Sequence, residues 1–236
     1  MLRAVLFDLD DTLFDHRHSS REALSVLQRE YYSDIGHVNI VELETVNLEI
    51  LNSVHVEVLA GTLTPDEARA KRFGMLFRKY GLTYSEETLR EVAALYRLHY
   101  QLSRRATPGA RSLLHAIRDR GIKTAIVSNN LVEEQMEKLH HCELLNLLDS
   151  ITISEEAGFS KPDARIFQIA IDRLESKPEE SIMIGDSWEN DIIGAQSIGI
   201  KALWYNCYLK ERPDMNVPEI RSLEDSDEVL RLLFSL

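Results

Sequence analysis

The stretch Ala4-Val5-Leu6-Phe7-Asp8-Leu9-Asp10-Asp11-Thr12 decides the fold, because a short apolar run ends abruptly in three carboxylates. A continuous hydrophobic run of this length is typical of a strand buried on both faces of a parallel sheet. In such sheets the ligand crevice lies beyond the carboxyl ends of the strands, and Asp8 and Asp10 project into it together. Two neighbouring carboxylates repel each other unless a cation or a shared proton compensates. The alternative interpretation is an acidic turn that caps a buried strand.

Length and composition limit the class of protein. The 236 residues are 44% hydrophobic and 28% charged, with a formal net charge of −12, which suits one large domain or a core with an inserted module. This charge disfavours a nucleic-acid partner, and an acidic protein that handles anions needs a local positive field from a metal ion or a few basic side chains. Two isolated cysteines, Cys142 and Cys207, indicate a reducing cytoplasm. No apolar run approaches the ~18 residues of a membrane span, and we expect neither a signal peptide nor a membrane partner.

The residues after Leu13 predict a helical insertion that runs to about Arg105. Four helices are expected: one capped by Ser19 or Ser20 and ending near Tyr32, one from about Ile40 to Ala60, one that follows the capping box Thr64-Pro65-Asp66-Glu67 and stops at Gly81, and one opened by Ser85-Glu86-Glu87. Short loops between them favour antiparallel neighbours in a four-helix module.

The pattern alternates between helices and strands after Thr107-Pro108-Gly109, where Thr107 is predicted to cap a helix that begins at Pro108. The expected strands cover residues 122–127, 151–153, 181–184 and 200–204. Such alternation implies βαβ units with right-handed crossovers and a parallel sheet. We therefore predict an α/β fold, with a Rossmann-like core of residues 1–13 and 106–236 and an all-helical cap of residues 14–105.

Polar side chains follow or flank several of these strands, and a parallel sheet brings them to one edge. They are Asp8, Asp10, Ser128, Lys161, Asp186 and Asp191. Mg²⁺ prefers hard oxygen ligands, and Asp8, Asp186 and a backbone carbonyl near Asp10 supply part of such a shell. Lys161 adds a compact cation, while Ser128 and the amides after it suit phosphate oxygens. A carboxylate can act as a nucleophile in phosphoryl transfer, and a second one can exchange the protons.

Each of these residues, taken alone, has a plain structural interpretation. Ser128 can be a strand-end hydroxyl, and Lys161 can belong to a solvated helix start. Asp186 can cap a helix together with Ser187, and Asp191 can add negative charge to a first helical turn. Their common placement at the edge where the crevice lies favours the functional interpretation.

The motifs, taken in order, resemble those of the haloacid dehalogenase-like hydrolase superfamily. The resemblance is carried by Asp8-Leu9-Asp10-Asp11-Thr12, by Ser128 after a buried strand, by Lys161 before a proline, and by Gly185-Asp186-Ser187-Trp188-Glu189-Asn190-Asp191. The insertion after the first motif resembles the helical cap of the C1 type. The dehalogenases of the family lack an acid two residues after the nucleophile, so Asp10 favours hydrolysis of a phosphate ester over cleavage of a carbon–halogen bond.

The resemblance also implies a role for each residue. By this resemblance, Asp8 is the nucleophile and a Mg²⁺ ligand, and Asp10 is the general acid/base and lends its main-chain carbonyl to the metal. Asp186 ligates the metal, and Asp191 supports the site directly or through water. Ser128 binds the phosphoryl group, Lys161 steadies the phospho-aspartate, and Thr12 and the amide of Asn129 contact phosphate.

The resulting expectation is a cytoplasmic, Mg²⁺-dependent phosphomonoesterase, monomeric or homodimeric. Its substrate would be a small soluble metabolite such as a nucleoside monophosphate or a sugar phosphate. Three alternatives stay open: a phosphomutase of the same fold, a 2-haloacid dehalogenase, and a regulatory protein that binds phosphate with little turnover. The cap helices carry an apolar stripe that is predicted to form the core of the helix bundle rather than a binding slot. The sequence therefore does not identify the part of the substrate other than its phosphate group.

Overall fold

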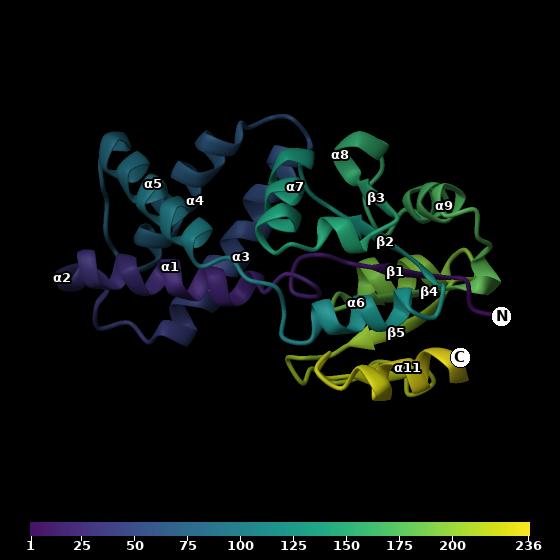
Figure 1. Cartoon of the computed structure of the whole chain (residues 1–236). Coiled ribbons are helices and arrows are strands. Elements are labelled where there is room, and N and C mark those ends of the chain that lie inside the picture. The colour runs from purple at the N-terminus through teal and green to yellow at the C-terminus, as the bar shows by residue number, and fades with distance from the viewer. The chain divides into compact units, whose positions relative to one another are not determined.

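A computed structural model describes residues 1–236 and divides them into two compact units. One unit comprises residues 1–15 and 105–236, and the other comprises residues 16–104. We call them the core unit and the cap unit. Figure 1 shows the sheet of the core unit and the helices of the cap unit, each of which is described by itself below.

The core unit is built on a six-stranded parallel sheet with the order β3-β2-β1-β4-β5-β6. The strands are β1 (Ala4–Phe7), β2 (Lys123–Ser128), β3 (Ser150–Ile153), β4 (Ser181–Gly185), β5 (Lys201–Tyr205) and β6 (Glu219–Ile220). β1 lies between β2 and β4, and Phe7 pairs with both Ile126 and Ile184. All four residues of β1 are fully buried, which explains its unbroken apolar run. The predicted α/β fold with a parallel sheet is confirmed.

Helices cover both faces of this sheet (Figure 1). They are α6 (Ala110–Arg118), α7 (Val132–His141), α8 (Ser154–Ala157), α9 (Ala164–Arg173), α10 (Gly194–Gln196) and α11 (Ser226–Ser235). Phe167 of α9 and Ala195 of α10 pack with Leu6 and Val127 in one buried cluster. Because successive strand residues point to opposite faces, Val5 and Phe7 lie on the other side of the sheet, where α6 contacts α11.

Two details of the core unit differ from the expectation. Thr107 does not cap a helix at Pro108, because α6 begins at Ala110 and its N-cap is Gly109 in the left-handed region, with φ of 84°. A Cβ at that position would overlap the backbone of Leu223. The strand β6 was not predicted, since a two-residue strand is too short to show a periodic pattern.

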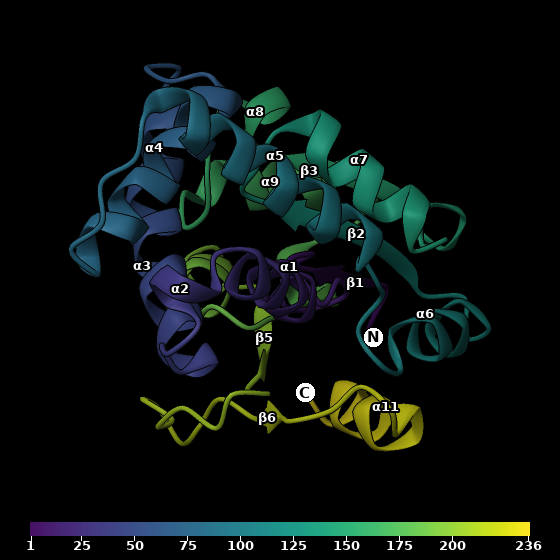
Figure 2. The ribbon, with the colours of Figure 1, turned by 90° about the vertical axis from the view of Figure 1, so that its left-hand side faces the viewer.

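The cap unit contains the four expected helices and one additional turn. They are α1 (His16–Glu30), α2 (Tyr32–Ile35), α3 (Ile40–Leu59), α4 (Pro65–Lys79) and α5 (Glu86–Leu102). α1 contacts α5, α4 contacts both α3 and α5, and Figure 2 shows α3 beside α4. The predicted capping box is present, with Thr64 and Glu67 each accepting a hydrogen bond from the other's backbone amide. No helix of either unit has the length and hydropathy that a membrane crossing requires.

The predicted cap of the first helix at Ser19 or Ser20 is wrong. α1 begins at His16, so both serines lie inside the helix, and both are buried. The hydroxyl of Tyr96 on α5 donates to Ser20 Oγ over 2.9 Å. The serines therefore belong to the interior of the bundle, where an inter-helix hydrogen bond takes the place of a cap.

Candidate active site

The site begins where β1 ends. The Asp8 amide still donates to the Ile184 carbonyl at 2.9 Å, so the backbone stays paired with β4 for one residue beyond the strand. The chain then reverses through Asp11, which has φ of 57°. The Leu9 carbonyl accepts hydrogen bonds from the amides that follow the reversal, including that of Thr12. These hydrogen bonds hold the short loop that follows Asp8 and carries Asp10 in one conformation.

Lys161 joins two carboxylates that are far apart in sequence. Its Nζ donates to Asp8 Oδ1 over 2.7 Å and to Asp191 Oδ1 over 2.6 Å, and its side chain is only 3% exposed. The side chain of Asn129 holds the backbone of this lysine, because Oδ1 accepts from the Lys161 amide and Nδ2 donates to the Lys161 carbonyl. Asn129 therefore positions Lys161, a function that the sequence did not reveal.

The segment after β4 brings the last acidic motif, residues 185–191, to the same site as Asp8 and Lys161. Trp188–Ile193 forms a π-helix, where an ordinary helix near Asp191 was expected, and the backbone amide of Ser187 donates to Asp191 Oδ2 over 2.9 Å. Gly185 is required here, since a Cβ would overlap the Asp191 carboxylate. Wide helical turns of this type are often found at functional sites.

Three carboxylates converge tightly enough to hold a metal ion. Asp8, Asp186 and Asp191 each offer one oxygen, and these atoms lie within 4.8 Å of one another. The set consists of hard anionic oxygens and is smaller than an octahedral shell, so it fits Mg²⁺, which usually keeps several waters or substrate oxygens. The site therefore has the donor chemistry that a magnesium ion needs.

The pKa values reflect an excess of negative charge in a buried place. Burial raises the pKa of Asp8 to about 7, with Asp191 adding to the rise and Lys161 only partly opposing it. Burial, followed by the charges of Asp8 and Asp191, raises the pKa of Asp186 well above its usual range. The pKa of Lys161 is raised, because the two carboxylates outweigh the opposing effect of burial. The ammonium of Lys161 contacts two of the three carboxylates, and a divalent cation would balance the remaining negative charge.

The side chain of Asp10 has other partners. Lys138 Nζ donates to Asp10 Oδ1 over 2.6 Å, and Gln135 Nε2 donates to Asp10 Oδ2 over 3.0 Å. Gln135 Nε2 also lies 2.6 Å from the oxygen of Ser128, the residue that ends β2. Both α7 residues are buried. Neither residue was predicted from the sequence, and the one signal that could have indicated them is their spacing of three on a helix that follows a site strand.

Thr12 and Ser128, the expected phosphate contacts, are fully enclosed. Thr12 is 0% and Ser128 1% exposed. The Thr12 hydroxyl oxygen has no hydrogen-bond partner in the structure, which is unusual for a buried polar group. This unpartnered hydroxyl belongs to the loop that also carries Asp10.

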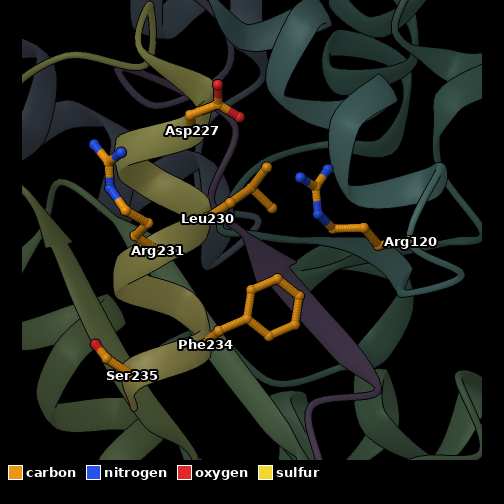
Figure 3. A pocket seen from close by; sticks show the side chains of 6 residues that line it. All are labelled: Arg120, Asp227, Leu230, Arg231, Phe234 and Ser235. Carbon is orange, nitrogen blue, oxygen red and sulfur yellow. The ribbon is translucent and has the colours of Figure 1, made fainter.

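A surface pocket lies elsewhere in the core unit. It has a volume of about 510 Å³ and is lined by residues of α11 together with Arg120, which follows α6. Figure 3 shows Leu230 and Phe234 of α11 between the two arginines Arg120 and Arg231. None of the predicted site residues lines it, so the chemistry is assigned to the carboxyl edge of the sheet.

The chain matches a known family and several characterised relatives. Haloacid dehalogenase-like hydrolases match residues 2–199. The glyceraldehyde 3-phosphate phosphatase of Pyrococcus furiosus is 30% identical over 204 residues, which cover 86% of this chain and 80% of that protein. The pyrimidine 5'-nucleotidase YjjG of Escherichia coli is 27% identical over 233 residues, covering 96% of each chain. The crystal structure of the HAD-hydrolase YfnB from Bacillus subtilis bound to magnesium superimposes with a TM-score of 0.74 at 27% identity, over 97% of this chain and 98% of that one.

Proposed function

This chain belongs to the haloacid dehalogenase-like hydrolase family, and from that premise we propose that it is a Mg²⁺-dependent phosphomonoesterase. Its substrate is a small phosphorylated metabolite of the sugar-phosphate or nucleoside-monophosphate type. The observation that carries the proposal is the contact of Lys161 with both Asp8 and Asp191, in a cluster to which Asp186 adds a third carboxylate. This cluster lies at the edge of the sheet where ligands bind in α/β folds.

The relatives support the class of substrate. One is named a glyceraldehyde 3-phosphate phosphatase and another a pyrimidine 5'-nucleotidase. Both names describe the removal of phosphate from a small organic alcohol. Asp10 supports the same class, because it stands two residues after Asp8, where a phosphatase needs a group that protonates the leaving alcohol.

In the first half-reaction Asp8 attacks phosphorus with one carboxylate oxygen. The bond between phosphorus and the ester oxygen breaks, and the carboxyl group of Asp10 gives its proton to the departing alcohol. Asp8 now carries the phosphoryl group as an acyl phosphate. Ser128 and Thr12 hold its oxygens by hydrogen bonds, and the ammonium of Lys161 offsets its negative charge.

In the second half-reaction water attacks the phosphorus of the aspartyl phosphate. Asp10, now ionised, takes a proton from that water, and the bond between phosphorus and Asp8 breaks. Inorganic phosphate leaves, Asp8 is a free carboxylate again, and Asp10 has regained its proton. The net reaction converts ester and water into alcohol and phosphate.

The metal site belongs to the same proposal. Asp8, Asp186, Asp191 and the main-chain carbonyl of Asp10 would hold Mg²⁺, which supplies positive charge to the phosphoryl oxygens when bound. The two cysteines, Cys142 and Cys207, form no disulfide, in keeping with a cytoplasmic enzyme.

Phosphate release from a panel of sugar phosphates and nucleoside monophosphates, with Mg²⁺ present, tests the function. We expect steady release of inorganic phosphate without any bisphosphate activator. A requirement for such an activator, with return of phosphate to the sugar, would identify a mutase. Halide release without Mg²⁺ would identify a dehalogenase, and inactivity over the whole panel would favour a binding protein with little turnover.

A further inference from the structure

We propose that Lys138 is a positioning residue for Asp10. Together with Gln135, which lies one turn earlier on α7, it holds the Asp10 carboxyl group where that group exchanges protons with the leaving alcohol and with water. The inference rests on the proposed function, in which Asp10 is the general acid/base. It adds a residue from a helix that carries none of the family motifs.

Lys138 is a buried cation whose ammonium is paired with the Asp10 carboxylate. Its side chain is 4% exposed, its Nζ lies 2.6 Å from Asp10 Oδ1, and it sits over the ring of Phe14 at 5.2 Å from the ring centre. Removing an ammonium from water is costly unless an opposite charge compensates. An apolar residue at position 138 would pack α7 against the sheet without the free-energy cost of burying a charge. The lysine is therefore explained by the carboxylate that it holds.

Gln135 ties Asp10 to the residue that ends β2. Its Nε2 donates to Asp10 Oδ2 over 3.0 Å and lies 2.6 Å from Ser128 Oγ, and the residue is 0% exposed. Its Oε1 has no partner. Gln135 thus donates to the carboxylate form of Asp10, the form that takes a proton from water in the second half-reaction.

The support of Asp10 is separate from the support of Asp8. Lys161 contacts Asp8 and Asp191, whereas Lys138 contacts Asp10 and Phe14. Removal of Lys138 therefore leaves the three metal-site carboxylates and their lysine in place. The Asp10 side chain loses its ion pair with the ammonium at Oδ1 and keeps the neutral donors Gln135 and Asn130 at Oδ2, so its carboxyl group is held less firmly. A displacement of about 1 Å in a reacting group can cost as much as 10²-fold in rate.

The test compares two esters in the full-length protein with Mg²⁺. Glycerol 3-phosphate releases an alkoxide that must be protonated, whereas p-nitrophenyl phosphate releases a stable phenolate that needs no proton. The quantity measured is kcat/KM, which covers the steps only up to release of the alcohol and excludes hydrolysis of the aspartyl phosphate. For Lys138→Met we expect kcat/KM to fall about 10- to 100-fold with glycerol 3-phosphate and to stay unchanged with p-nitrophenyl phosphate.

Three further variants complete the experiment. Asp10→Asn sets the limit of the effect, with an expected loss of about 10²–10⁴-fold on the alkyl ester. Lys138→Arg keeps a cation beside Asp10 and should restore much of the rate. Lys177→Met is the matched control, because Lys177 is exposed and precedes β4 at the opposite edge of the sheet. It should match the wild type on both esters.

The outcomes separate the inference from the function on which it rests. If the wild type hydrolyses neither ester nor any member of the metabolite panel, the proposed function fails. If the wild type is active and Lys138→Met slows both esters equally, or neither, Lys138 has no positioning role although the function stands. If Lys138→Met does not fold, Lys138→Gln and Lys138→Arg are compared instead, and an equal ratio of the two esters in both variants overturns the inference.

Discussion

Buried cations occur in both units, and their surroundings differ. In the core unit, Lys161 and Lys138 are almost completely enclosed and each donates to carboxylate oxygens at 2.6–2.7 Å. In the cap unit, Arg72 is 6% exposed and its guanidinium lies over the rings of Phe73 and Tyr96, at 4.6 and 4.5 Å from their centres. Its Nε has no hydrogen-bond acceptor, and burial lowers the pKa of the group.

The difference distinguishes buried cations that pair with carboxylates of the candidate site from a buried cation that is stabilised by packing on aromatic rings. A cation between carboxylates is stabilised by them and in turn keeps them together, so its removal should damage both the fold and the reaction. A cation on aromatic faces gains less, roughly 0.5–1 kcal/mol at an exposed ring and about 2 kcal/mol or more when desolvated. The following experiments test this contrast, from the largest expected effect to the smallest.

The largest effect is expected when Asp8 is replaced, the carboxylate that together with Asp191 accepts hydrogen bonds from Lys161. Asp8→Asn should abolish phosphate release, because an amide oxygen is too weak a nucleophile to form the phosphoryl intermediate. The fold should persist, since Lys161 keeps its contact with Asp191. Phosphate release with Mg²⁺ and the far-UV circular dichroism spectrum are the measurements. Appreciable hydrolysis by a folded variant would contradict covalent catalysis by Asp8.

Removal of the shared cation should lower stability by about 3–5 kcal/mol, as breaking a buried ion pair usually does. In Lys161→Met the carboxylates of Asp8 and Asp191 face each other without their ammonium. Urea unfolding in EDTA measures the loss, and Mg²⁺ should recover part of it because a divalent cation can take over the same charges. Lys177→Met serves as the exposed control. An unchanged unfolding midpoint for Lys161→Met would remove Lys161 from the charge balance of the site.

The pH dependence of metal stabilisation should follow from the raised pKa values. Without metal, the pKa of Asp8 is raised to about 7 in the native state, against about 3.9 in the unfolded chain, and the pKa of Asp186 is raised as well. The native state therefore holds more protons than the unfolded state between these values, and these groups make stability fall as pH rises through that window.

Because Mg²⁺ binds the ionised carboxylates, it should raise the melting temperature more at pH 7.5 than at pH 5. Thermal unfolding with MgCl₂ and with EDTA at both pH values measures the difference. Asp8→Asn is the control, in which the dependence on pH should be weaker. Equal metal-induced shifts at the two pH values in the wild type would contradict the charge imbalance described for the site.

The smallest effect is expected in the cap unit. Arg72→Met should leave the free energy of unfolding unchanged or raise it by about 1 kcal/mol, since an apolar side chain of similar length avoids burying a guanidinium whose Nε has no acceptor. Urea unfolding measures it, with the exposed Arg78→Met on the same helix as the control, for which we expect a change within about 0.5 kcal/mol. A loss of several kcal/mol for Arg72→Met would show that the ring faces stabilise the cation as strongly as carboxylates do.

The sequence predicted those parts of the molecule whose signals are local. The run from Ala4 to Phe7 indicated a buried strand of a parallel sheet, and the structure confirms it. The capping box at Thr64 and the start of α3 at Ile40 were also read correctly. The convergence of Asp8, Lys161 and Asp191 follows once the strands are parallel. The catalytic roles of these residues stay predictions.

Other features depend on contacts between distant segments. Ser20 looked like a helix cap, yet its hydroxyl is used inside the bundle by Tyr96. Gly109, rather than Thr107, sets the start of α6 because the chain passes close to Leu223. The sequence indicates which residue types are present and their local spacing, and these features alone cannot tell which distant segment will pack against them.

The sequence by itself determined the α/β class, the inserted helices and the acidic motif after β1, because periodicity and residue type act over a few neighbouring positions. Only the tertiary structure decided that a second lysine meets Asp10. Lys138 reaches Asp10 from a helix, and this pairing depends on how the crossover connections return to the sheet. That return is a property of packing across more than a hundred residues, which no local pattern encodes.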